Sequence, residues 1–168
     1  MNQHTNLLRA AVLTVSDRSF HGTREDKAGP QLSDFLREKG IQVTQSAVCP
    51  DEITEIARTL RQWADEGGVD LIFTTGGTGV APRDVTPEAT LSVLDRVIPG
   101  IAEAMRAASA AKTPHAMLSR AVAGVRGRVL IINLPGSPRG AVENAAAIID
   151  AAPHAVAKIQ GDPSDCAA

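Results

Sequence analysis

Aromatic residues are scarce in this 168-residue chain, which has one Trp, three Phe and no Tyr. A chain of this length buries roughly 70% of its unfolded surface, so its core must be built from aliphatic side chains. Cysteine is also rare. Cys49 and Cys166 lie far apart in the sequence, and we expect two reduced thiols and no disulfide.

Strong charge of either sign is absent, because the formal net charge is only −2. The protein therefore has no general attraction to nucleic acid or to anionic membranes, and we expect neither as a partner. No stretch approaches the ~20 apolar residues of a membrane span. Residues 1–6 are polar and lack the pattern of a signal peptide. The sequence predicts a cytoplasmic protein with one domain over residues 1–160 and a disordered tail over residues 161–168.

Apolar runs alternate with segments of helical period, which is typical of an α/β fold. The pattern predicts a three-layer, Rossmann-like domain with a mostly parallel sheet and helices on both faces. Strands are expected at residues 7–15, 41–48 and 69–73, and a hairpin of two more at 119–123 and 128–133. Helices are expected at residues 26–39, 51–66, 87–97 and 99–111, and from Pro138 onward, with Ser137 as the cap of the last one.

A glycine-rich loop follows the expected strand 69–73 and leads to a helix start, with Thr86 as its candidate N-cap. Small residues let a backbone approach a phosphorylated ligand and leave its amide donors free. No Lys follows Gly79, so the loop is not a P-loop, and its glycine spacing differs from the dinucleotide fingerprint. The loop indicates a phosphate or nucleotide site, with a plain tight turn as the alternative. Its residues of interest are Thr75, Gly76, Gly77, Thr78, Gly79 and Asp84.

Polar residues follow each of the expected parallel strands. Ser16 and Asp17 come after the first, Asp51 after the second, the glycine loop after the third, and residues 133–138 after the last. Ligands of open α/β sheets bind at the carboxyl ends of the strands, so we expect these four loops to form one site. Ser137 would add a helix N-terminus, which attracts anions.

Several of these residues also have a simpler interpretation. Asp51 is well placed to cap the helix that follows it, and Asp84 could only stabilise a turn. Ser16 and Asp17 could only shape the turn after the first strand. Arg120 could neutralise a phosphate or stay in solvent. The four histidines show no metal-ligand spacing, so no zinc site is expected.

Seven motifs in fixed order carry a family resemblance. They are TVSD at residues 14–17, EDKAG at 25–29, PDE at 50–52, TTGGTG at 74–79, PRDVTPEAT at 82–90, LSR at 118–120 and NLPGSP at 133–138. Between about Leu8 and Ala151 the chain resembles the molybdopterin-binding family of molybdenum-cofactor biosynthesis, in particular the Mog-type molybdopterin adenylyltransferases and their MoaB-like relatives. The resemblance implies a reaction of ATP with molybdopterin that gives adenylyl-molybdopterin and pyrophosphate.

The resemblance also implies roles for residues. Asp51 and Asp84 match the essential acids of the family, and Mg²⁺ is usually held by one or two carboxylates together with substrate phosphates and waters. The substrate-binding set implied is Ser16, Asp17, Thr75, Gly76, Gly77, Thr78, Gly79, Ser119, Arg120, Asn133, Leu134, Pro135, Gly136 and Ser137.

A homotrimer is implied, or a hexamer, with transient contact to molybdopterin-synthase and molybdenum-insertion proteins. A non-catalytic molybdopterin-binding protein of the same family, and an unrelated nucleotide-dependent α/β enzyme, remain as alternatives.

Overall fold

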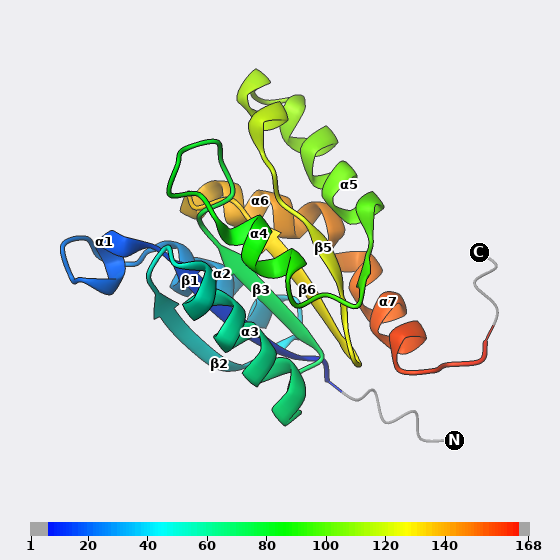
Figure 1. Ribbon diagram of the computed structural model, residues 1–168. Coiled ribbons are helices and arrows are strands. Elements are labelled where there is room, and N and C mark those ends of the chain that lie inside the picture. The colour runs from blue at the N-terminus through cyan, green and yellow to red at the C-terminus, as the bar shows by residue number, and fades with distance from the viewer. Residues whose placement is uncertain (1–6, 165–168) are drawn as a thin grey trace.

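A computed structural model describes residues 7–164 and places a six-stranded sheet in the middle layer, with strand order β2-β1-β3-β6-β5-β4 (Figure 1). Four neighbouring strands run parallel, and β5 and β4 are antiparallel to their neighbours. This confirms the expected mostly parallel α/β fold. The strands are β1 Arg9–Val15, β2 Gln42–Cys49, β3 Leu71–Thr75, β4 Arg96–Val97, β5 Ala123–Arg126 and β6 Val129–Leu134.

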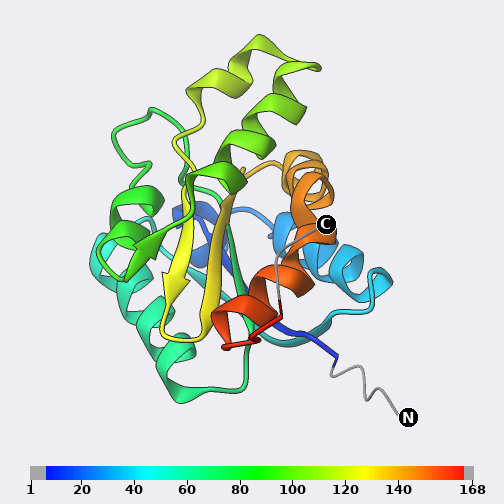
Figure 2. The same ribbon diagram turned by 90° about the vertical axis from the view of Figure 1, so that its right-hand side faces the viewer.

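Helices cover both faces of the sheet, as Figure 2 shows along its edge. Alternate residues of a strand point to opposite faces, so Ala10 and Val12 pack with α2, α5, α6 and α7, whereas Ala11 and Leu13 pack with α3 and α4. The helices are α1 Asp17–Phe20, α2 Ala28–Glu38, α3 Ile53–Glu66, α4 Thr86–Leu91, α5 Pro99–Ala110, α6 Pro138–Ile148 and α7 Ala152–Ile159, with 3-10 turns η1 Pro114–Leu118 and η2 Ile149–Ala151.

The expected helix over residues 87–97 is wrong in its second half. α4 ends at Leu91, and the chain then forms the edge strand β4. The backbone N–H groups of Asp95 and Ile98 donate to the carbonyls of Val125 and Ala123. Pairing with a strand distant in sequence therefore decides the conformation of this segment, and the helical period does not.

The expected hairpin is confirmed, but its first strand begins later than expected. Ser119 and Arg120 precede β5, and Gly124 lies inside it. A Cβ atom at Gly124 would lie 2.3 Å from the carbonyl oxygen of Arg96 on the neighbouring strand. Gly124 is thus a point of close backbone approach and not part of the turn, which Gly127 provides with a φ of 55°.

The expected caps have mixed outcomes. Ser137 does cap α6, because its Oγ accepts from the Gly140 N–H at 3.1 Å and Pro138 opens the helix. Thr86 is not a cap: it lies inside α4, and its hydroxyl donates to the Gly76 carbonyl at 2.8 Å. Asp51 does not cap α3 either, because Glu52 occupies the N-cap position.

Cys49 is buried and free, and burial raises the pKa of its thiol to about 12. Cys166 lies outside the described residues, as do residues 165–168 of the expected tail. Residues 161–164 continue from α7, with the Asp162 N–H donating to the Ala157 carbonyl at 2.9 Å. Within residues 7–164, no helix combines the length and the apolar character that crossing a membrane requires.

Candidate functional site

The four parallel strands end side by side at one edge of the sheet. Val15 pairs with Cys49, Thr14 pairs with Thr75, and Thr75 pairs with Leu134. The loops that follow these strands therefore start from the same edge, as expected from the order of the polar motifs. The Thr75 hydroxyl donates to the Pro135 carbonyl at 2.7 Å and ties the third loop to the fourth.

Two large hollows open at this edge. The first, of about 1100 Å³, is lined by residues after β1, β2 and β3, and we call it the β1-side hollow. The second, of about 640 Å³, lies between the loop after β3, α5, η1 and the start of α6, and we call it the α5-side hollow. Both hollows are lined by Gly77, Asp84, Gly136 and Ser137, so they meet at these residues.

The glycine loop is held by close backbone contacts of its own. Gly76 has a φ of 108°, and a Cβ atom there would lie 2.2 Å from the Val15 carbonyl oxygen. Gly77 has a φ of 65°, and its Cβ would lie 2.3 Å from Thr86 Oγ1. The loop thus needs these glycines for its shape, whatever ligand it binds.

Asp51 is bound to Asp17 by two reciprocal hydrogen bonds. The Asp17 N–H donates to Asp51 Oδ2 at 2.7 Å, and the Asp51 N–H donates to Asp17 Oδ1 at 3.0 Å. Asp51 lines the β1-side hollow beside Asp17. The Asp51 carboxyl group, for which the sequence also allowed a helix-cap role, is therefore directed into the site.

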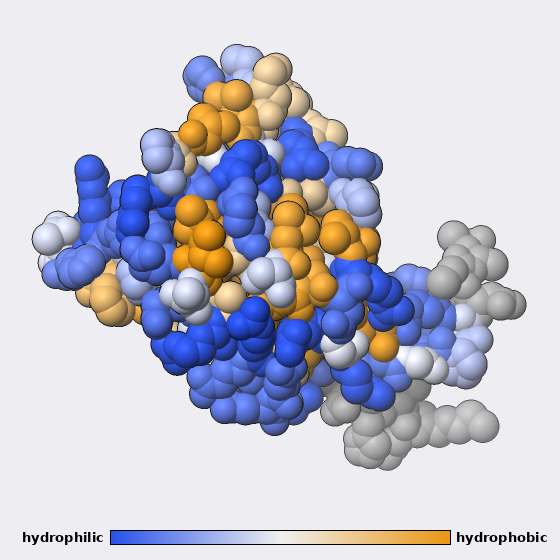
Figure 3. Space-filling model, in the orientation of Figure 1, coloured by the Kyte–Doolittle hydropathy of each residue, from blue (hydrophilic) through white to orange (hydrophobic). Residues whose placement is uncertain are grey.

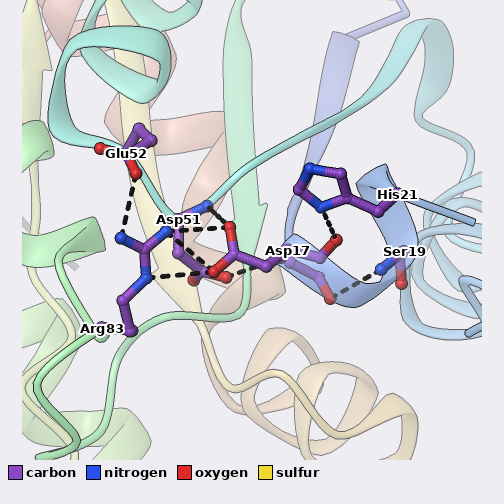
Figure 4. A network of polar contacts seen from close by, with 7 residues as sticks. Asp17, Ser19, His21, Asp51, Glu52 and Arg83 are labelled. Atoms are coloured by element: carbon purple, nitrogen blue, oxygen red, sulfur yellow. Dashed lines mark hydrogen bonds and ion pairs between the residues drawn. The ribbon is translucent and has the colours of Figure 1, made fainter. Parts of the chain in front are cut away.

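Arg83 joins three of the site loops, as Figure 4 shows. Its guanidinium donates to both carboxylate oxygens of Asp17 at 2.8 to 3.1 Å, and to Glu52 at 3.0 Å. No role for Arg83 follows from the sequence motifs alone. Its position in the sequence could have indicated the ion pair, because this basic residue precedes Asp84 in a loop expected to lie at the same strand ends as Asp17.

The two acids at the strand ends are shifted in opposite directions. Burial raises the pKa of Asp51, and the nearby Asp17 and Asp84 carboxylates add to this, although the hydrogen bond from Asp17 acts in the other direction. For Asp17, burial opposes the shift, but hydrogen bonds from the Asp51 N–H and from Arg83 lower its pKa. Asp17 is thus the ion-paired carboxylate, and Asp51 is the one whose charge is less well compensated.

Asp84 stabilises its own loop through one oxygen only. Its Oδ2 accepts from the Ala81 N–H at 2.8 Å, so the simple turn interpretation is correct for that atom. Among the described residues, no donor reaches Oδ1 of Asp84 or Oδ1 of Asp51. Both acids line the β1-side hollow, where these oxygens are available to a ligand.

Magnesium fits this donor set. Residues 7–164 contain no group of three or more His, Cys, Asp or Glu side chains arranged to hold a metal. An ion that needs one or two carboxylates and takes its remaining ligands from waters and phosphates does not require such a group. The available oxygens of Asp51 and Asp84 match that requirement, whereas both oxygens of Asp17 are already engaged by Arg83.

Two residues expected to contact substrate, Asn133 and Leu134, line neither hollow. Asn133 and Leu134 lie at the end of β6 with no exposed surface. The Asn133 side chain donates to Thr74 Oγ1 at 3.0 Å and to Thr90 Oγ1 at 2.9 Å, and it accepts from the Val122 N–H at 3.3 Å. Its amide is fully used inside the protein, where it links β3, α4 and the segment before β5.

Arg120 is also placed differently from the expectation. Its guanidinium donates to the Gly79 carbonyl at 2.7 Å and to the Asp84 carbonyl, and it pairs with Glu88. It lines neither hollow, unlike its neighbour Ser119, which lines the α5-side hollow. Ser16 lines the β1-side hollow and caps α1 by accepting from the Ser19 N–H at 3.2 Å.

Residues 11–154 match the protein family described as "Probable molybdopterin binding domain". The chain belongs to this family. It is 42% identical to the molybdopterin adenylyltransferase of Haemophilus influenzae over 148 residues, which cover 87% of this chain and 75% of that protein. With the molybdopterin adenylyltransferase of Helicobacter pylori strain J99 it shares 40% identity over 157 residues, covering 92% and 89% of the two chains.

Gephyrin of Dictyostelium discoideum is 43% identical to the chain over 162 residues, and there the match covers 90% of this chain but only 22% of gephyrin. Among solved structures, the molybdopterin biosynthesis enzyme MoaB of Thermus thermophilus has a TM-score of 0.87 and 50% identity, with 95% of this chain and 100% of that chain covered. The Mog protein of Mycobacterium ulcerans has a TM-score of 0.84 and 41% identity, with 90% and 99% covered. The fold is thus that of the molybdopterin-binding family.

Proposed function

We propose that the chain is a molybdopterin adenylyltransferase, which transfers AMP from ATP to the terminal phosphate of molybdopterin and releases pyrophosphate. The observation that carries this proposal is the meeting of the two hollows at Gly77, Asp84, Gly136 and Ser137. A transfer between two phosphorylated substrates requires that their reacting phosphates meet at one place, with a binding region on each side. The identity to adenylyltransferases supports the same reaction.

The start of α6 contributes positive potential at this meeting point. Ser137 caps an 11-residue helix, and the N-terminus of a helix carries roughly half a positive charge with unpaired N–H donors. A Cβ atom added at Gly136 would lie only 3.1 Å from the Cα of Gly76, so the two backbones are close together. The helix end and the glycine loop therefore form one surface of backbone groups, which suits the charge of a phosphate in transfer.

The nucleophile needs little activation. A phosphate monoester has its second pKa near 6, so at neutral pH it is already an anion. The side chains of the site then have to bring two anions together and offset their repulsion. Arg24 and Lys27 line the β1-side hollow, and Arg106 and Lys112 line the α5-side hollow, so each substrate has cations on its own side.

Asp51 and Asp84 would hold Mg²⁺ in this proposal. When bound, the ion would neutralise charge on the ATP phosphates and on the departing pyrophosphate. Asp17 would not be a ligand, because Arg83 engages both of its oxygens. Its role is to orient Asp51 through the reciprocal hydrogen bonds.

The direct experiment measures pyrophosphate and adenylyl-molybdopterin formed from purified protein, ATP, Mg²⁺ and molybdopterin. Asp51→Asn and Asp84→Asn keep the shape of each side chain and remove its charge. Asp150→Asn, at an exposed position of η2 outside both hollows, is the matched control. We expect product from the wild type and the control, and a loss of at least about 100-fold in kcat from the two site variants, a size typical of lost transition-state electrostatics.

Other outcomes would lead to the alternatives. If the wild type binds molybdopterin and forms no product, the chain is a non-catalytic binding protein. If ATP is hydrolysed without any pterin, the reaction class is different. Omitting Mg²⁺ and adding a chelator tests the metal separately, and an unchanged rate would remove it from the proposal.

We also propose that the chain forms a homotrimer, with a hexamer as the alternative. Figure 3 shows apolar patches on the face that carries α4 and at the tip formed by α5 and η1. Exposed apolar side chains include Leu91 at 47%, Val97 at 48% and Met117 at 74%, and gathered apolar surface favours association. Light scattering after size exclusion would give the mass of the assembly. Contact with molybdopterin-synthase and molybdenum-insertion proteins stays a prediction.

A further inference from the structure

Arg120 makes an unusual set of contacts for a residue beside a phosphate site. Its Nε donates to the Gly79 carbonyl at 2.7 Å, and its Nη2 donates to the Asp84 carbonyl. Its backbone N–H donates to the Thr78 carbonyl at 2.9 Å. Arg120 alone thus contacts both the start and the end of the loop over residues 78–84.

Asp84 is oriented by this loop. Its N–H donates to the Ala81 carbonyl at 2.9 Å, and its Oδ2 accepts from the Ala81 N–H at 2.8 Å. These bonds fix Asp84 relative to Ala81, but they do not fix the loop relative to the sheet. Arg83 ties the loop to Asp17 and Glu52 on the β1 side. The guanidinium of Arg120 supplies a second connection on the β5 side, because its planar set of donors reaches two carbonyls at once.

Glu88 completes the arrangement from the first turn of α4. Its carboxylate pairs with Arg120, and this hydrogen bond is the main reason that the pKa of Glu88 is lowered. Neither Glu88 nor Arg120 lines the β1-side hollow or the α5-side hollow. The guanidinium therefore has a carboxylate partner of its own and is directed into the loop, away from the space in which a substrate would lie.

We propose that Arg120 and Glu88 form a brace that positions Asp84 and the glycine loop for adenylyl transfer, and that Arg120 does not itself bind a substrate phosphate. The inference rests on the proposed function for its catalytic part. Arg120 is then a positioning residue, which acts through Asp84. Misplacement of a catalytic group by about 1 Å can cost on the order of 100-fold in rate.

The kinetic test compares Arg120→Ala with Arg126→Ala. Arg126 is a matched control, because it also pairs with a carboxylate, Asp65, and donates to a carbonyl, that of Val93, but lines neither hollow. We expect Arg120→Ala to lower kcat by about 10- to 100-fold, with KM for ATP and molybdopterin changed less than about 3-fold. Arg126→Ala should keep kcat. A large rise in KM at constant kcat would instead make Arg120 a phosphate-binding residue and overturn the brace.

Chemical rescue separates positioning from general damage. Guanidinium ion at low millimolar concentration should recover part of the kcat of Arg120→Ala, whereas urea, a neutral molecule of the same shape, should not. Glu88→Gln keeps the volume of the brace and should lower kcat less than Arg120→Ala does. The double variant should be no slower than Arg120→Ala alone, because the two residues act as one unit. Additive losses would contradict this.

A measurement independent of activity tests the structural part. Amide hydrogen exchange of residues 78–84 should become faster in Arg120→Ala than in wild type, and unchanged in Arg126→Ala. Unchanged exchange in both variants would refute the brace even if the wild type were active. Faster exchange in Arg120→Ala, together with a wild type that forms no product, would leave the brace and refute the proposed function.

Discussion

Asp17 and Asp51 each accept a hydrogen bond from the backbone N–H of the other, at 3.0 Å and 2.7 Å respectively. The ends of β1 and β2 are thereby joined by a closed pair of side chain to backbone contacts. A side chain that binds a neighbouring backbone in this way cannot change rotamer freely. The reciprocal pair thus explains how Asp51, which follows an edge strand, is held in one orientation at the site.

This pair makes a prediction about stability. Asp17→Ala should remove the acceptor of the Asp51 N–H and lower the free energy of unfolding by about 1 to 2 kcal/mol, whereas Asp17→Asn, which keeps an acceptor oxygen, should lose less. Urea denaturation of both variants measures the difference. The ion pair with Arg83 contributes little of it, because the Arg83 side chain is 57% exposed and such surface pairs are worth about 0 to 1 kcal/mol. Equal losses in the two variants would mean that the lost charge, and not the lost acceptor, is responsible.

Asp51 makes a prediction about pH. Its pKa is raised in the folded protein, chiefly by burial, so the folded state binds a proton more readily than the unfolded chain does. Its ionisation therefore lowers stability as pH rises through the folded pKa. Asp51→Asn, which cannot ionise and keeps an acceptor for Asp17, should be more stable than wild type at pH 7. The difference should disappear below the unfolded pKa of about 3.9. Denaturation midpoints at several pH values test this, and a neutral-pH variant less stable than wild type would contradict it.

Asn133 was expected to bind substrate, and the structure makes it a structural residue. Asn133→Ala would leave the Val122 N–H and the buried Thr74 hydroxyl without their side-chain partner, whereas the Thr90 hydroxyl would keep its bond to the Thr86 carbonyl. We expect a loss of about 3 kcal/mol in the free energy of unfolding, because unsatisfied buried polar groups cost about 1 to 3 kcal/mol each. Ser119→Ala, in the wall of the α5-side hollow, is the control; it removes only one long hydrogen bond, from the Ala121 N–H at 3.4 Å, and should lose much less stability. KM values of the folded fraction of Asn133→Ala should stay close to wild type, and a selective rise in KM would restore the contact role.

The difference between expectation and structure has a physical origin. Strand ends and the Ser137 cap are local features, so hydrophobic period and capping preference predicted the edge of the sheet at which the site lies. Burial and side-chain direction depend on contacts between distant segments. The motifs of the chain contain Asn133, Arg120 and Arg83, but whether each side chain faces the hollow, the core or another loop depends on Thr90, Glu88 and Asp17, which are far from them in sequence.

The glycine loop allows one more prediction, which separates its shape from its chemistry. Gly77→Ala would place a Cβ 2.3 Å from Thr86 Oγ1 at a φ of 65°, and strain of this kind costs about 1 to 3 kcal/mol. Gly100→Ala, in the first turn of α5 with open space around the added Cβ, should be neutral or slightly stabilising. Adding Thr86→Ala to Gly77→Ala removes the clashing oxygen and should recover part of the lost stability, although the Thr86 bond to the Gly76 carbonyl is lost too. Thermal denaturation of the four proteins decides the point. If Gly77→Ala unfolds like wild type but no longer forms product, the need for glycine at this position comes from the substrate and not from Thr86.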